Sequence, residues 1–222
     1  MTLRQLSVLL ALVIPTLALA QTISVYDAFY RIEAGASSGA SNDFQTQFGN
    51  VGAPQSYFNR VDAFASEANS TVHSWASVDW NCTPTDLDLE LIACWDSFDN
   101  GAGNSGHMLS RAIIVIEVDQ PNFVSTSAVF DQPESWAEID AWNGFTWIPL
   151  VGRNQISNYS GLWNTGYYRL WAERVYDRTG NSTGCEPWDF NLHAQAVPEP
   201  ASILALSAGA ALLLRRRKAR IA

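Results

Sequence analysis

The stretch Asp86-Leu-Asp-Leu-Glu-Leu-Ile-Ala93 alternates apolar and acidic side chains with a period of two. Successive side chains of a β-strand point to opposite faces of a sheet. The alternation therefore predicts a half-buried strand whose inward face carries Leu87, Leu89, Leu91 and Ala93. An amphipathic helix would group its polar side chains on one face, whereas Asp86, Asp88 and Glu90 recur at every second position.

The same period recurs elsewhere and predicts further strands. The candidates with this period are Thr71–Trp80, Tyr167–Tyr176 and Trp188–Gln195. Ala112–Val118 is more continuously apolar, as expected for a central strand. Asn143-Gly144 lies between apolar flanks and is a hairpin signal, because both residues of such a turn take positive φ. We therefore expect a hairpin formed by Trp136–Trp142 and Phe145–Val151.

Strands at this spacing, with polar turns and no convincing long helix, predict an all-β fold. We expect an antiparallel β-sandwich of jelly-roll-like type over residues 21–196. Gly35–Asn42 is small and polar and is expected to be the most flexible stretch of this body.

The N-terminal residues are typical of a secretory signal peptide. Arg4 lies in a short basic region, Leu6–Leu19 is apolar, and Ala18-Leu-Ala20 fits a small-x-small cleavage site. Residues 1–20 are therefore expected to be removed between Ala20 and Gln21, so that the mature chain begins at Gln21.

The C-terminal residues 197–222 have three parts in a fixed order. Val197-Pro198-Glu199-Pro200-Ala201-Ser202 comes first and overlaps an apolar run of 14 residues, Ala201–Leu214. A basic cluster follows, with Arg215, Arg216, Arg217, Lys218 and Arg220. The run is shorter than the roughly 20 residues of a comfortable transmembrane helix. Basic flanks favour the cytoplasmic side, so we expect the tail in the inner membrane with its last residues inside.

This three-part tail resembles the PEP-CTERM sorting signal of exported bacterial proteins. The resemblance implies a short transmembrane sorting helix and processing near Pro198-Glu199-Pro200 by an exosortase, a membrane transpeptidase-like enzyme. It also implies an exopolysaccharide-producing bacterium with an outer membrane. The expected route is an inner-membrane intermediate, then the cell surface or extracellular matrix. Ser160–Leu170 is similar to a Gly-x-Leu, Gly-x-Tyr-x-Leu stretch seen before the tail in that group.

The charge of the body excludes one class of partner. Without the two ends, seven arginines remain against 21 carboxylates, a net charge of −14, and no lysine remains. Such a surface repels phosphate backbones, so we expect no nucleic-acid partner.

Three cysteines, Cys82, Cys94 and Cys185, allow one disulfide and leave one thiol. Export makes a disulfide permissible. Cys82–Cys94 is the local choice and the one we expect, while Cys185 could replace either partner if the last strand lies alongside.

One loop, 96–104, has the composition of a metal site. Asp96, Asp99, Asn100 and Asn104 offer oxygen ligands, and calcium takes six to eight of these. The spacing departs from the EF-hand loop, and an acidic turn between strands has the same composition. We therefore expect no cofactor, with calcium at this loop as the alternative.

Motifs of catalysis are missing from the sequence. It has no Gly-x-Ser-x-Gly, no His-Glu-x-x-His and no phosphate-binding glycine loop. We therefore expect a structural, non-enzymatic surface or matrix protein. The alternative is a carbohydrate-binding module for exopolysaccharide that uses some of the nine tryptophans, and a polysaccharide-active enzyme ranks last.

Overall fold

The computed structural model describes residues 23–197 apart from 68, 102, 130–134 and 154, and most of these lie in strands. The signal-peptide prediction, with cleavage between Ala20 and Gln21, and the sorting tail from Pro198 onward lie outside the described residues. Within the described part of the chain, no helix has the length and apolar character needed to cross a bilayer.

Twelve strands form two six-stranded antiparallel sheets. The first sheet contains, in spatial order, β2 (Ser41–Gly52), β1 (Ile23–Ser38), β6 (Ser105–Val118), β11 (Gly166–Thr179), β8 (Trp136–Trp142) and β9 (Trp147–Val151). The second contains β10 (Ser160–Trp163), β7 (Asn122–Val129), β12 (Ser182–Ala196), β5 (Asp86–Phe98), β4 (Ser70–Cys82) and β3 (Ser56–Glu67). A short 3-10 helix, Ile156–Asn158, connects β9 to β10. The predicted all-β class is confirmed.

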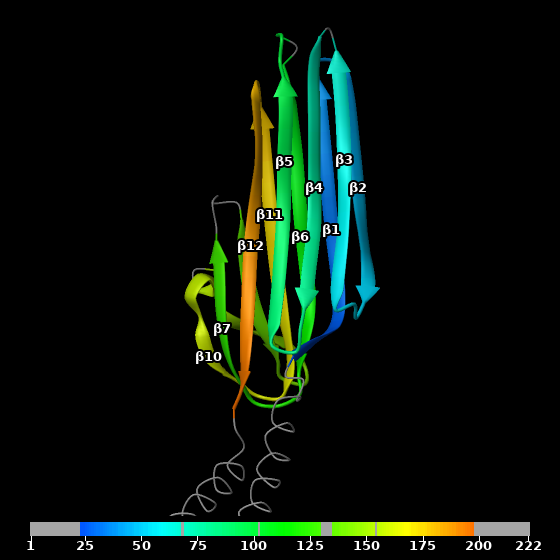
Figure 1. Cartoon of the computed structure of the whole chain (residues 1–222). Coiled ribbons are helices and arrows are strands. Elements are labelled where there is room, and N and C mark those ends of the chain that lie inside the picture. The colour runs from blue at the N-terminus through cyan, green and yellow to red at the C-terminus, as the bar shows by residue number, and fades with distance from the viewer. Residues whose placement is uncertain (1–22, 68, 102, 130–134, 154, 198–222) are drawn as a thin grey trace, which may run out of the picture.

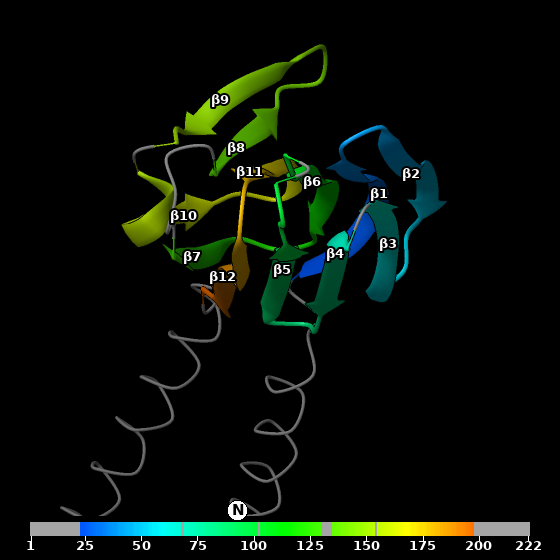
Figure 2. The same ribbon diagram turned by 90° about the horizontal axis from the view of Figure 1, so that it is seen from above.

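The two sheets lie face to face, as the view along the strands shows (Figure 2). β1 packs on β3 and β4, and β6 packs on β4 and β5. The last two strands insert between earlier ones, β11 between β6 and β8, and β12 between β5 and β7. The long strands run side by side over the length of the molecule (Figure 1).

The core lies between the sheets and matches the predicted inward faces. Leu87, Leu89, Leu91 and Ala93 of β5 are buried. Trp188, Phe190, Leu192 and Ala194 of β12 are also buried, as their alternation predicts.

One core contact requires a glycine, Gly106, because it leaves no room for a side chain. Trp95 is fully buried, and its ring lies against Gly106 of β6. A Cβ added to Gly106 would be 2.0 Å from Cζ3 of Trp95, far inside van der Waals contact. Glycine is therefore required here by packing.

The structure adds detail to two local predictions. Gly35–Asn42 is the end of β1, a tight turn and the start of β2, because Gly39 supplies the positive φ of +56° that the turn needs. The hairpin at Asn143-Gly144 is confirmed, but only Gly144 has positive φ, and β9 begins at Trp147. Asn143 instead accepts hydrogen bonds on Oδ1 from the N–H groups of Phe145 and Thr146, which closes a four-residue turn.

Candidate functional site

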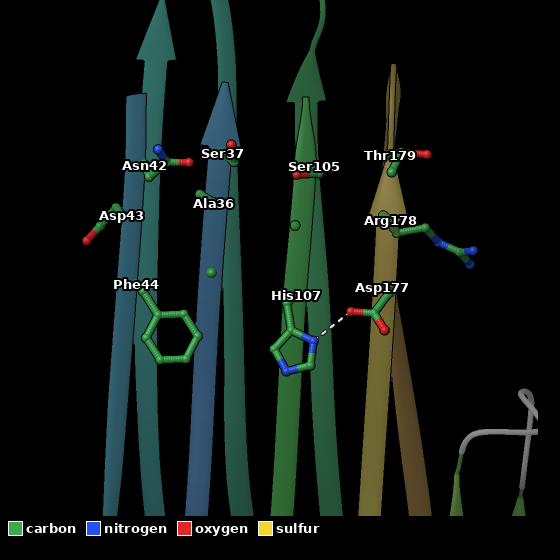
Figure 3. Close-up of a pocket in the computed structure, with 12 residues that line it drawn as sticks. Ala36, Ser37, Asn42, Asp43, Phe44, Ser105, His107, Asp177, Arg178 and Thr179 are labelled. Atoms are coloured by element: carbon green, nitrogen blue, oxygen red, sulfur yellow. Dashed lines mark hydrogen bonds and ion pairs between the residues drawn. The ribbon is translucent and has the colours of Figure 1, made fainter. Parts of the chain in front are cut away.

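A hollow of about 410 Å³ lies on the outer face of the first sheet, at one end of the strands (Figure 3). Residues of four neighbouring strands line it, namely β2, β1, β6 and β11. Phe44, Gly35, His107 and Asp177 are directly opposite one another in the strand register, so they form one row across the sheet.

Because Gly35 is a glycine and has no side chain, there is room between Phe44 and His107. A Cβ at Gly35 would lie 3.1 Å from the Phe44 ring, which therefore leans over the bare backbone. The ring is 57% exposed although phenylalanine is apolar. The result is an accessible aromatic surface beside polar groups.

Polar groups line the other side of the hollow. Nδ1 of His107 lies 2.6 Å from a carboxylate oxygen of Asp177, and its Nε2 lies 3.8 Å from Oε2 of Glu33. Arg178 also borders the hollow, but its guanidinium points away from the row and stacks over the ring of Tyr176 at 3.9 Å (Figure 3). His107 and Asp177 can exchange hydrogen bonds with a hydroxyl-rich ligand while Phe44 offers an apolar face.

The two carboxylates that line the hollow are far apart. Asp43 is on β2 and Asp177 on β11, three strand spacings away, which is about 14 Å. Glycosidases place their two carboxyl groups closer, at about 5–10 Å. The Asp43 carboxylate points away from the row (Figure 3) and accepts a hydrogen bond from the Phe64 N–H, which lowers the pKa of Asp43.

A second set of carboxylates lies on the outer face of the second sheet. Asp79, Glu90 and Asp189 are directly opposite one another on β4, β5 and β12. Partial burial, and then the charges of Asp189 and Asp79, raise the pKa of Glu90. No group of three His, Cys, Asp or Glu side chains in the described ranges could hold a metal ion.

The predicted calcium loop is held by hydrogen bonds. Asp99 accepts from the backbone N–H groups of Gly101, Gly103 and Asn104, and Asp96 accepts from the Thr183 hydroxyl. The buried Asn104 amide donates to three oxygens, the carbonyls of Thr71 and Phe98 and the Ser97 hydroxyl. The N–H of Asn100 donates to the Ser70 hydroxyl. The Asp96 and Asp99 carboxylates thus have hydrogen-bond donors within the protein, whereas Oδ1 of Asn104 is buried without a hydrogen-bond partner among the described residues.

The disulfide joins Cys94 to Cys185, so the expected Cys82–Cys94 pair is wrong. In the β4–β5 register, Cys82 is opposite Leu87, seven residues from Cys94. That offset is about 23 Å along the strand, whereas a disulfide needs Cα atoms less than about 7 Å apart. Cys185 is directly opposite Cys94 on β12, and Cys82 is a buried free thiol.

The tryptophans divide between the core and the outer surface. Trp80, Trp95, Trp163 and Trp188 are fully buried. On the outer face of the first sheet, Trp136 lies beneath Arg153 at 3.5 Å and is tilted by 35° against Trp171. A flat, exposed tryptophan row, which would favour polysaccharide binding there, is not formed by these two side chains.

The residues of the hollow could not be identified as a group from the sequence. The sequence has three histidines that are far apart, Phe44 lies in no predicted strand, and Gly35 belongs to the stretch expected to be flexible. Each of the three histidines has an aspartate partner, the others being His73 with Asp62 and His193 with Asp86. Sequence spacing gives no signal for partners that only the strand register brings together.

Both ends of the described chain lie at the opposite end of the sandwich from the hollow (Figure 1). The N–H of Ile23 donates to the Pro84 carbonyl, and the N–H of Ala194 donates to the Thr85 carbonyl. The β4–β5 turn thus accepts hydrogen bonds from both the first strand and the last. The N–H of Val197 donates to the Pro121 carbonyl, so the folded body continues to the residue before Pro198.

Comparison with known proteins finds a match at the C-terminal end of the chain. A family model, the PEP-CTERM protein-sorting motif, matches residues 196–218. No curated protein and no solved structure gives a significant match. The matched segment begins at the last residue of β12, where the body ends. The chain thus carries a PEP-CTERM protein-sorting motif at residues 196–218, which implies export and membrane-associated sorting.

Proposed function

We propose that the protein is a structural, non-enzymatic component of the cell surface or extracellular matrix, released from the inner membrane by an exosortase. The observation that carries the proposal is the position of the motif. It begins at Ala196, where the central strand β12 ends, so removal of the tail leaves every described strand intact. The cross-strand disulfide and the charge of −14 suit a soluble protein outside the cell.

Replacement of Pro198-Glu199-Pro200 by alanines tests this route. The body should still fold, because its last anchored residue is Val197, but the full chain should stay in the inner membrane. Mass spectrometry of the parent protein at its final location should show an N-terminus at Gln21 and no tail. Detection of residues 212–222 on that material would contradict exosortase release and indicate a plain membrane anchor.

A second candidate function is saccharide binding in the hollow, as a non-catalytic module. The supporting observation is the row of Phe44, Gly35, His107 and Asp177, which places an exposed aromatic ring beside hydrogen-bonding groups. A pyranose ring offers an apolar face for the phenyl ring and hydroxyls for the rim. The hollow is large enough for one or two sugar units.

A matched pair of variants tests saccharide binding. Phe44 and Phe48 lie on the same face of β2 and are similarly exposed, at 57% and 67%, but only Phe44 lines the hollow. Calorimetric titration of the exported protein with cellohexaose should show binding that Phe44→Ala weakens about tenfold, or about 1.4 kcal/mol. Phe48→Ala should leave it unchanged. Equal loss in both variants, or no binding by the parent, would exclude the hollow as the cellohexaose site.

A further inference from the structure

Covalent geometry limits how far the body can be from the membrane before processing. Val197 is held by the fold, and the apolar run of the sorting tail begins at Ala201. Four Cα–Cα steps separate them and span at most about 14 Å. The headgroup region on each side of the hydrocarbon core is about 5–8 Å thick. When the tail is inserted, the end of the sandwich that carries Val197 therefore lies at or close to the lipid headgroups.

An exposed apolar patch lies beside this exit point. Phe123 of β7 is opposite Gln195 of β12, and Leu162 of β10 is opposite Phe123. Neighbouring strands are about 4.8 Å apart, so both side chains lie within about 10 Å of the last residues of β12. Phe123 is 50% exposed, Leu162 59% and Val197 41%. We call these three residues the exit patch.

The β8–β9 hairpin adds a second apolar group at the same end. Ala141, near the end of β8, is opposite Tyr168, which is opposite Ile116, which in turn is opposite Val25 near the start of the described chain. The turn beyond β8 therefore points to the end where both termini leave. Phe145 in this turn is 91% exposed, the highest value among the large exposed apolar side chains of the described residues.

We propose that the exit patch and Phe145 enter the lipid interface and hold the body against the membrane until the tail is removed. Phe and Leu side chains on a protein surface can insert into the boundary between headgroups and acyl chains, and the buried apolar area adds affinity. The charge of −14 opposes electrostatic binding to anionic lipid, so the contact is an apolar one. Once the tail is gone, these few side chains cannot retain the body, which leaves the membrane.

Fluorescent labels on the full chain, inserted by its tail into phosphatidylcholine nanodiscs, test this contact. Leu162→Cys places an NBD label in the exit patch, and Phe98→Cys is the matched control. Both native side chains are 59% exposed, but Phe98 is at the far end of β5. The native Cys82 thiol is buried and stays unlabelled under native conditions. Phe123→Cys provides a second exit-patch label if the first variant folds poorly.

The expected result is a blue-shifted emission at position 162 that nitroxide-labelled phosphatidylcholine quenches, with neither effect at position 98. Nanodiscs rich in phosphatidylglycerol should reduce both effects at position 162, because the body and that lipid are anionic. No quenching at position 162, or equal quenching at both positions, would overturn the proposal. A blue shift that requires added membrane proteins would also overturn it, since the patch would then dock a protein.

Discussion

Removal of the Cys94–Cys185 disulfide should lower the stability of the body by roughly 4–5 kcal/mol. The bond closes a loop with a sequence separation of 91, and the chain-entropy model gives about 4.6 kcal/mol for a loop of that length. The loop runs from the end of β5 to the start of β12 and contains all the strands between them. Without the bond, the unfolded chain has a higher conformational entropy, which favours unfolding.

The assay is guanidinium chloride unfolding of the exported protein, without reductant, followed by far-UV circular dichroism. With a slope of about 4 kcal/mol per molar denaturant, the double variant Cys94→Ala/Cys185→Ala should unfold at a midpoint about 1 M lower. Reduction of the parent protein should produce a similar shift. The matched control is Cys82→Ala, which removes a buried thiol without a bond and should cost only about 1 kcal/mol.

The double variant separates two explanations of the stability of the sandwich. If the free energy of unfolding of the double variant lies within about 1 kcal/mol of the parent value, the bond does not stabilise the fold through the entropy of a long loop, and the reasoning is refuted. A control variant that costs as much as the double variant would equally show that packing at cysteine sites, rather than closure of the loop, sets the loss.

Three further predictions concern single residues. The raised pKa of Glu90 means that the folded protein disfavours the charged carboxylate. The charged carboxylate therefore lowers the free energy of unfolding. This loss is absent below the unfolded-state pKa and complete above the folded-state pKa. Glu90→Gln should therefore raise the free energy of unfolding at pH 7 by up to about 1 kcal/mol and leave it unchanged at pH 3, as urea titrations can show. Gly106→Ala should lower the thermal midpoint through its clash with Trp95, at a cost of about 2 kcal/mol, while Gly184→Ala, with open space around it, should not. Burial raises the pKa of the Cys82 thiol to about 11, so a thiol reagent at pH 8 should find no reactive cysteine in the folded protein and one in denaturant.

Local periodicity determined the strands that bury one face and expose the other. In β5 and β12 every second side chain enters the core, so the sequence pattern and the burial pattern coincide. The same cannot hold for β2, an edge strand whose side chains are exposed or only partly buried. Its residues, Ser41–Gly52, show no inward face in the sequence because the fold gives them none.

The C-terminal motif could also be recognised from the sequence alone. Its three parts are contiguous, so order and spacing along the chain contain all the information, and the family match agrees. That match concerns sorting and depends on no contact made by the folded body.

Only the tertiary structure decided the features that join distant strands. The partner of Cys94 is 91 residues away and follows from the insertion of β12 beside β5, which no local pattern specifies. The hollow likewise needs four strands in one register before Phe44 and Asp177 share a face. Strand alternation is a local steric property and can be predicted from sequence, whereas register and strand order depend on how all the apolar faces pack together.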